Sequence, residues 1–395
     1  MRKAAAAAIL LLGIALRLRG VFTDFWLDEI WGLRIALDAP SWLALITRIH
    51  ADTNHPLVSM YMRAIGPAQH WEWYRAFSLL CGIGTMLLIR DRMYRMLAAL
   101  SFPLIVYSSE ARGYAPAAFF LLLAYVTRRR LVFGMAIVLA ILSHLSAVGV
   151  YLGFLVADLW RAGTLACPPA RGQARVPVLH RHVGPLAFCV WYFFIKVRHL
   201  VSGGGPRWTP DPFVLAIGIL TLAIVIAEIV RRIRARDAEA IFFAVAIIVG
   251  PLIAAASYRC PCVLPRHFFV CMPFVLILFA SFFERVPRWG IAVFILLNAI
   301  QLVPFMIYGR GQYDRALHDI SGTVGGDSAF RDRMLIDFYN PSLRYGAPRP
   351  EWLLIENPRP IPGYVLWRTY PYGGVSGWTW YVYRASWSNP ASIQR

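Results

Sequence analysis

The chain has 395 residues, of which 58% are hydrophobic and only 15% are charged. Soluble domains carry about 25% charged residues, so this composition excludes an ordinary soluble protein and indicates an integral membrane protein. The net charge of +19 would suggest a nucleic-acid partner in a soluble protein, but here the basic residues stand in short blocks between apolar segments, and we predict no such partner.

The N-terminal stretch, residues 1–20, reads MRKAAAAAILLLGIALRLRG and has the basic start and apolar core of a secretory signal peptide. No clear small-residue cleavage site precedes the DFWLDE stretch, and many apolar segments follow. We therefore predict an uncleaved first membrane helix.

Apolar segments of membrane-crossing character recur along the chain, and a bilayer core needs about 20 apolar residues per helix. We predict eleven spans, near residues 4–20, 75–90, 94–109, 113–127, 131–144, 146–160, 183–197, 212–230, 239–257, 267–283 and 289–307. The fifth and sixth have almost no loop between them and could instead form one long or broken helix plus a neighbour.

The basic residues set the predicted orientation. With the N-terminus in the cytoplasm, the basic blocks of the inside loops agree with the positive-inside rule at every crossing. These blocks are Arg2–Lys3, Arg90 to Arg95, Arg128–Arg130, Arg161 to Arg181, Arg231 to Arg236 and Arg285 to Arg288. The location predicted is the plasma (inner) membrane of a bacterium.

An odd number of spans leaves the C-terminus outside the cytoplasm. Residues 308–395 turn polar, with prolines, glycines and short β-rich runs such as GYVLW and WTWYVYR. We predict an all-α polytopic membrane domain over 1–307, with interfacial helices in its first outside loop, followed by a small extracytoplasmic α/β domain over 308–395.

The first outside loop, residues 21–74, begins with DFWLDEIWGL, which contains the adjacent acids Asp28 and Glu29. If this stretch is helical, an apolar stripe suited to the membrane interface forms from Trp26, Ile30, Leu33 and Leu37. Asp28 then points almost opposite the stripe, into the space that the outside loops enclose, and Glu29 lies near its flank, toward headgroups. A helix-start carboxylate that satisfies free N–H groups is the alternative for Asp28.

Two further outside-facing segments carry candidate residues. His55 precedes Pro56, a residue suited to a first helical turn, and is either a cap-like residue or a site residue. In YSSEARGYAP, Glu110 and Tyr114 could share a helix face, and Arg112 points elsewhere unless the segment is a turn. A local ion pair at a helix end is the alternative there.

The remaining outside candidates are His144, Arg259 and Arg266. His144 lies at the outer end of a span and is either a packing residue or a site residue. The two arginines, in SYRCPCVLPRHFF, lie where the positive-inside rule gives them no topological purpose. Guanidinium groups at a membrane edge suit a phosphate, which they bind in bidentate fashion, and contact with lipid headgroups is the alternative.

The sequence does not indicate a metal or another cofactor. Its six cysteines include no CxxC pair with metal-ligand spacing. Asp28 and Asp52 are two carboxylates on separate predicted helices, too few to predict a divalent-metal site.

Taken together, these segments resemble the C-type superfamily of membrane glycosyltransferases, in particular the protein O-mannosyltransferases and lipid A aminoarabinose transferases. The resemblance runs in order over about residues 5–280 and rests on six motifs: WLDE at 26–29, HPL at 55–57, RAFSLLCGIGTMLL at 75–88, SSEARGYA at 108–115, SHLSA at 143–147 and PRHFF at 265–269.

The resemblance implies a polyprenyl-phosphate sugar as donor at the outer membrane face, Asp28 as catalytic base, and Arg266 among the basic residues that hold the lipid phosphate. We predict that Arg266 and Arg259 bind the donor phosphate, with Arg112 as the next candidate. The acid that the family usually has two residues before the histidine is replaced by Thr53, with Asp52 one position earlier. We predict an inverting glycosyltransferase whose sugar and acceptor are open. The alternative is a transporter or flippase of lipid-linked sugars, which would require ionisable residues deep within spans.

Overall fold

The computed structural model describes residues 2–51, 54–127, 129–162, 179–200, 212–257 and 265–387. Its elements follow in chain order. The helices are α1 (Arg2–Val21), α2 (Leu27–Asp38), α3 (Trp42–Thr47), α4 (Pro56–Ile65), α5 (Glu72–Leu88), α6 (Arg92–Leu100), α7 (Phe102–Ser108), α8 (Tyr114–Val126), α9 (Arg130–Ser143), α10 (Ala147–Arg161), α11 (Val183–Ile195), α12 (Pro212–Arg234), α13 (Ala240–Ala244), α14 (Gly250–Ser257), α15 (Met272–Phe283), α16 (Trp289–Tyr308), α17 (Tyr313–His318) and α18 (Ala329–Tyr339). The strands are β1 (Thr323–Gly326), β2 (Arg344–Tyr345), β3 (Trp352–Ile355), β4 (Tyr364–Tyr370) and β5 (Trp380–Ala385).

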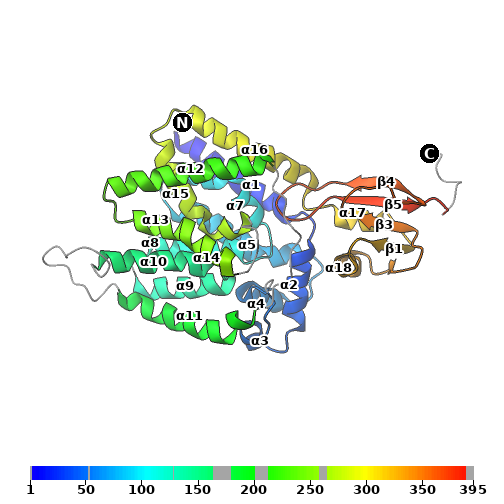
Figure 1. Ribbon diagram of the computed structural model, residues 1–395. Helices are drawn as coiled ribbons and strands as arrows, with labels where there is room; N and C mark the ends of the chain where they lie inside the picture. The colour runs from blue at the N-terminus through cyan, green and yellow to red at the C-terminus, as the bar shows by residue number, and fades with distance from the viewer. Residues whose placement is uncertain are drawn as a thin grey trace.

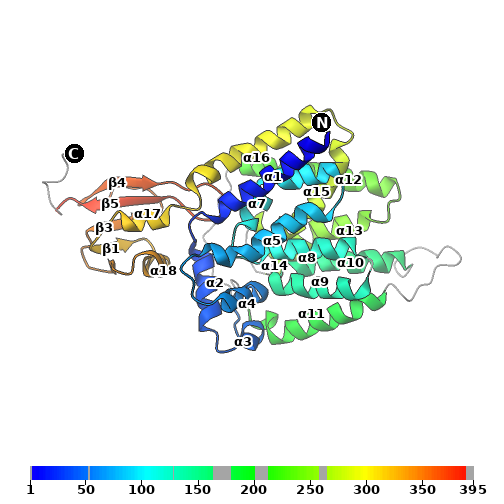
Figure 2. The same cartoon turned by 180° about the vertical axis from the view of Figure 1, so that it is seen from behind.

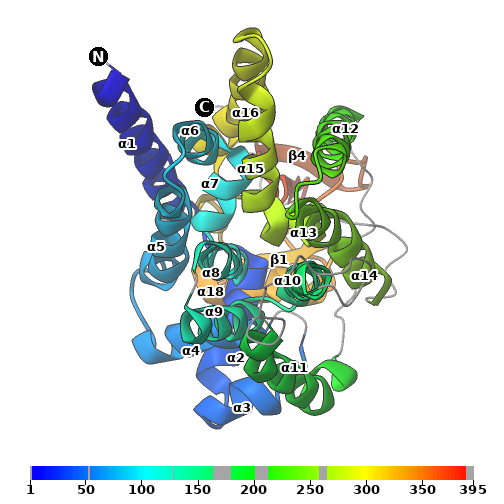
Figure 3. The same cartoon turned by 90° about the vertical axis from the view of Figure 1, so that its left-hand side faces the viewer.

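The long helices run side by side in a bundle, and the sheet stands beyond one end of it, which we call the sheet end (Figure 1). The short helices α2, α3 and α4 lie at this end, with α2 between the bundle and the sheet (Figure 2). Seen along the bundle, α1 and α16 lie toward one side and α11 toward the other, around α8, α9 and α10 (Figure 3). The sheet end is the face predicted to lie outside the cytoplasm.

The number of membrane spans predicted from sequence is not confirmed. Among the described residues, three helical segments are long and apolar enough to cross a membrane: 4–21, 212–234 and 289–318. Other apolar helices are shorter; α8, for example, has 13 residues and is about 20 Å long, against a bilayer core of about 30 Å. The closely spaced pair at 131–160 forms two helices, α9 and α10, separated by a turn at His144–Ser146.

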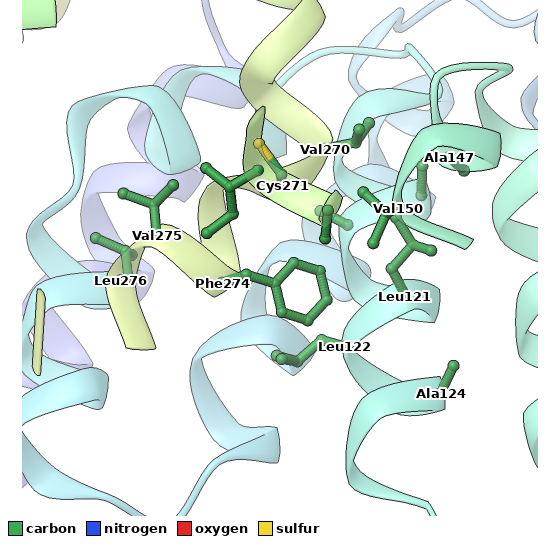
Figure 4. Close-up of a cluster of buried hydrophobic side chains, with 14 of the residues drawn as sticks. Leu121, Leu122, Ala124, Ala147, Val150, Val270, Cys271, Phe274, Val275 and Leu276 are labelled. Atoms are coloured by element: carbon green, nitrogen blue, oxygen red, sulfur yellow. The ribbon is translucent and has the colours of Figure 1, made fainter. Parts of the chain in front are cut away.

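The bundle core is apolar and continuous. Phe274 of α15 and Leu121 and Leu122 of α8 are buried in one cluster with Val150 of α10 (Figure 4). Helices α10 and α14 approach closely at two glycines. A Cβ on Gly149 would lie only 2.8 Å from the carbonyl carbon of Gly250, so no larger residue fits there. Small residues at such a contact allow helix backbones to pack together without a polar partner.

The C-terminal part forms the small α/β domain expected from its composition. Its five strands lie in the order β2-β1-β3-β5-β4. Strand β1 is parallel to β2 and β3, whereas β5 is antiparallel to β3 and β4, so the sheet is mixed. The predicted domain boundary at 307/308 falls at the last turn of α16, and no observation tests it.

The stripe predicted to lie in the membrane interface is instead partly buried in protein, which corrects that expectation. Ile30 and Leu33 of α2 belong to a cluster with Tyr313 and Leu335, which come from α17 and α18. The Tyr339 hydroxyl donates a hydrogen bond to the Phe25 carbonyl oxygen at 2.7 Å. Helix α2 buries Ile30, Leu33 and Ala36 against other parts of the chain. Periodicity alone does not distinguish lipid from protein as the apolar partner.

Candidate active site

Helix α2 directs its two adjacent acids to different partners. The helix starts after Trp26, and the Glu29 carboxylate accepts a hydrogen bond from the Trp26 backbone N–H at 3.2 Å. Consecutive helical residues are about 100° apart around the axis, so Asp28 and Glu29 diverge. The sequence predicted different roles for these two acids on the basis of this helical geometry.

Glu29 forms a closed ion pair with Arg75 in the first turn of α5, and both side chains are fully buried. Arg75 Nε donates to Glu29 Oε1 at 2.8 Å, and the Ala111 N–H donates to the same oxygen at 2.6 Å. Burial alone would raise the pKa of Glu29, but the charges of Arg75 and Arg310 and these hydrogen bonds outweigh it and lower that pKa. The expectation that Glu29 points toward headgroups is therefore wrong.

Glu110 occupies a second buried ion pair, with Arg310 Nε 3.3 Å from Glu110 Oε1. Arg310 also donates to the carbonyl oxygens of Gly20 and Val106 and contacts Thr23, so it binds the ends of α1 and α7 together. Burial raises the pKa of Glu110, although the Arg310 charge opposes the shift. The local ion pair that the sequence left as the alternative is therefore not what Glu110 forms, because its partner lies 200 positions away.

Arg112 lies in the turn between α7 and α8, and the turn lets it point away from the start of α8 toward α2. Its Nη1 donates to Asp28 Oδ2, and its guanidinium carbon lies 5.7 Å from the centre of the Trp26 ring. The Asp28 side chain keeps 19% of its surface exposed. This pair, unlike the two before it, presents a carboxylate to solvent.

His55 is part of this group. It occupies the N-cap position of α4, but its side chain makes no capping hydrogen bond. Its Nε2 lies 3.3 Å from Arg112 Nη2. Burial, with the positive charge of Arg112, holds the pKa of His55 well below its usual range. Since guanidinium can only donate, the His55 Nε2 accepts and the neutral ring carries its proton on Nδ1.

His144 and Tyr114 complete the cluster. The rings of His55 and His144 stack with centroids 4.9 Å apart, and the Tyr114 ring lies 4.4 Å from that of His144. The start of α8 and the end of α9 meet here without space for a side chain, because a Cβ on Gly113 would lie 1.7 Å from the Ser143 carbonyl oxygen. The predicted face shared by Glu110 and Tyr114 is not present, since Glu110 precedes the helix.

Three predicted residues are not placed. Asp52 and Arg259 lie outside the described residues. Arg266 belongs to the 3-10 helix Pro265–Cys271, but its side chain is likewise outside the described part. The same short helix brings Phe269 to 5.8 Å from Tyr114, so Arg266 lies in a segment packed beside the cluster.

A metal site built on Asp28 and Asp52 stays untested, because Asp52 is not among the described residues. Where the structure does describe the chain, no three His, Cys, Asp or Glu side chains gather as metal ligands would.

Arg75 and Arg310 were missed by sequence reasoning, although a signal was available. Both lie at the ends of spans that are predicted to face outside, where the positive-inside rule gives them no topological purpose. This argument singled out Arg259 and Arg266, and it applies equally to Arg75 and Arg310. It would have identified two buried cations at the sheet end of the bundle.

No protein-family model matches the chain, and a search of curated proteins found no significant match. One solved structure is similar: that of ArnT from Cupriavidus metallidurans in the apo state, with a TM-score of 0.54 and 12% sequence identity, covering 98% of this chain and 98% of that chain. At this identity the similarity shows the fold alone. It confirms the membrane glycosyltransferase fold of the C type that the sequence motifs predicted.

Proposed function

From this fold and the geometry around Asp28, we propose that the protein is a membrane glycosyltransferase that takes its sugar from a polyprenyl-phosphate donor. The single observation that carries the proposal is the Asp28 carboxylate, held by Arg112 at the sheet end of the bundle and partly exposed. The fold shared with ArnT supports sugar transfer over the alternative of lipid transport.

In the proposed reaction, the acceptor hydroxyl oxygen forms a bond to the anomeric carbon of the sugar. The bond between that carbon and the phosphate oxygen breaks, and its electron pair leaves with polyprenyl phosphate. Asp28 accepts the hydroxyl proton. A single displacement of this kind inverts the anomeric configuration.

A carboxylate is a weak base for a hydroxyl, so Asp28 acts as the new bond forms and not before it. Arg112 fixes the carboxylate in position and offsets its charge, which favours the approach of an anionic donor. The neutral His55 on the other side of Arg112 adds no positive charge of its own.

We further propose that the sheet end faces outward from a bacterial plasma membrane, with the N-terminus in the cytoplasm. The arrangement of basic residues supports this orientation. The acceptor remains unassigned, because the described residues around Asp28 favour no single acceptor chemistry. Arg266 and Arg259 are proposed to contact the donor phosphate; the packing of Phe269 beside Tyr114 supports a position near the site for Arg266.

The test is to incubate purified protein with a panel of polyprenyl-phosphate sugars and to measure release of polyprenyl phosphate and of sugar product. We expect turnover with one donor class and none in the Asp28→Asn variant. Absence of turnover with every donor, together with transport of lipid-linked sugar across vesicles, would replace the transferase with the transporter.

A further inference from the structure

A wide cleft runs along helix α2 at the sheet end of the molecule. It has a volume of about 450 Å³ and is open to solvent. Trp31, Arg34 and Ile35 of α2 line it, together with Ile49 from the segment after α3 and Met334 from α18. Helix α18 lies on the sheet side of α2 (Figure 1). The cleft therefore lies where the bundle meets the C-terminal domain.

The proposed base, Asp28, lies at the N-terminal end of the helix face that lines this cleft. Helical residues turn by about 100° and rise by about 1.5 Å each, so Asp28 and Ile35 lie about 20° apart around the axis and about 10 Å apart along it. Trp31 lies between them, one turn after Asp28. The Asp28 side chain keeps 19% of its surface exposed. A ligand in the cleft can therefore reach Asp28 with one end if it is longer than about 10 Å.

Trp31 gives the cleft an aromatic surface next to the base. Its ring meets that of Phe330 in α18 edge to face, with the centroids 5.0 Å apart, and this arrangement covers at most one face of the indole. Trp31 is only partly buried, and 53% of Phe330 is exposed. An indole combines an apolar face with an N–H at its edge. This combination suits a ligand that presents both C–H and O–H groups, as a sugar ring does.

The charges at the cleft favour a neutral ligand. Among the described residues that line it, Arg34 is the one cation, and Asp38, exposed at the far rim, is the one acid. Arg34 is already paired with Asp337 of α18, with Nη2 and Oδ2 3.3 Å apart. The lining therefore offers no net positive charge to a phosphate or carboxylate. None of these lining residues lies in a strand, so the cleft also offers no strand edge to which an extended peptide could add.

We infer that the cleft binds the acceptor and that the acceptor is a neutral saccharide chain. The inference rests on the proposed function and names the substrate class that the residues in contact with Asp28 do not select. One sugar unit stacks on Trp31, a second lies against Ile35, and the terminal unit presents a hydroxyl to Asp28. Its oxygen bonds to the anomeric carbon of the donor sugar, its proton passes to Asp28, and the electron pair of the broken bond leaves with polyprenyl phosphate.

The experiment measures binding of neutral oligosaccharides to the purified full-length protein in lipid nanodiscs, by isothermal titration calorimetry and without donor. The probes are gluco-, galacto- and manno-oligosaccharides of increasing length. One series should bind, with an affinity that rises with length until the cleft is filled. Trp31→Ala should lower this affinity about 10-fold, through the loss of one aromatic contact. Trp31→Phe should recover part of the affinity, because it retains an aromatic ring.

Trp73→Ala is the matched control, because Trp73 also lies at the sheet end, is 62% exposed and does not line the cleft. It should bind the oligosaccharide as the wild type does. If Trp31→Ala fails to fold, Ile35→Trp places a larger side chain in the cleft, leaves the Trp31 ring in place and should weaken binding several-fold. Unchanged affinity in the folded Trp31→Ala protein, or in Ile35→Trp where that variant is needed, overturns the inference.

Donor turnover separates this inference from the proposed function. Transfer of the donor sugar to the bound oligosaccharide, with a higher acceptor KM in Trp31→Ala, supports both. Turnover by a wild-type protein that binds none of the oligosaccharides leaves the glycosyltransferase in place and overturns the saccharide acceptor. Trp31-dependent binding of a peptide rich in serine and threonine, or of a phosphorylated oligosaccharide in preference to the neutral one, also overturns it. An oligosaccharide that binds without turnover of any donor refutes the proposed function and the acceptor role with it.

Discussion

The two ion pairs made by consecutive residues of α2 differ in their access to solvent. Glu29 and Arg75 are both fully enclosed, whereas Asp28 keeps 19% of its side-chain surface exposed and its partner Arg112 retains an unsatisfied Nε. The enclosed pair holds α2, α5 and the turn before α8 together. The exposed pair has unused hydrogen-bonding capacity and a carboxylate open to solvent, which is what a reacting group requires.

On helix α2, Glu29 stabilises the packing and the neighbouring Asp28 is left available for chemistry. Both Glu29 oxygens accept hydrogen bonds within the protein, from Trp26, Arg75 and Ala111. A buried charge network is stabilising only when every member is satisfied, and it then becomes rigid. Asp28 sits one position earlier on this rigid support, so its position is fixed while its surface stays accessible.

The substitution Asp28→Asn should have the largest effect on activity. It removes the proposed base but keeps the size of the side chain, and loss of general-base assistance costs about 10²- to 10⁴-fold in rate. Because the Asp28 carboxylate is partly exposed, thermal stability should fall less than in Glu29→Gln, whose ion pair is fully enclosed. Asp38→Asn, on the same helix but exposed, is the control and should keep full activity; an equal loss in both variants would show that Asp28 has no special role.

Glu29→Gln should instead remove stability. It leaves the buried Arg75 charge without its partner, and breaking one side of a buried ion pair costs about 3–5 kcal/mol. Chemical denaturation in detergent would measure this loss, followed by activity of the fraction that remains folded. A Glu29→Gln protein that is as stable as the wild type but inactive would reverse the assignment of the two acids.

Asp332 in α18 offers a contrast with Glu29, because burial prevails over its neighbour Arg331 and raises the pKa of Asp332 to about 6. A raised pKa in the folded state means that its contribution to stability is complete below the unfolded value near 3.8 and is lost as the pH rises through about 6. The loss amounts to at most about 3 kcal/mol.

The pH dependence of unfolding checks this expectation. The unfolded and folded pKa values of Asp332 both lie between about pH 3.8 and 6. As the pH rises from about 4 to 7, the wild type should therefore lose stability relative to Asp332→Asn, which has no proton to release. Glu29 has a lowered pKa, so its contribution changes in the opposite sense and is lost as the pH falls. A stability difference between the two proteins that does not vary with pH would contradict the burial of Asp332 as a carboxyl group.

Gly113→Ala should act on the Asp28–Arg112–His55 side of the comparison. The added methyl group would lie 1.7 Å from the Ser143 carbonyl oxygen and 3.0 Å from His55 Cγ, so α8 and α9 must separate. Overpacking of this kind costs typically about 1–3 kcal/mol, and donor kcat/KM should fall as His55 moves. Gly218→Ala in α12, where a Cβ meets nothing within 4 Å, should not lower stability, because alanine favours a helix over glycine, and should leave kcat/KM unchanged.

Much of the local organisation followed from the sequence. Apolar runs predicted the helical bundle, the polar C-terminal composition predicted an α/β domain, and helical geometry predicted that Asp28 and Glu29 point to different surroundings. The ordered motifs predicted the C-type glycosyltransferase fold, which the similarity to ArnT confirms. These inferences succeed because they depend on residues that are close together in the chain, or on the order of motifs along it.

The partners of the charged residues were decided only by the tertiary structure. Glu29 pairs with a residue 46 positions away, Asp28 with one 84 away and Glu110 with one 200 away. Hydrophobic periodicity indicates which side of a helix a residue occupies, but not whether lipid, water or another helix covers that side. Packing of α2 between the bundle and the C-terminal sheet therefore determined that Glu29 is enclosed and that Asp28 remains partly exposed.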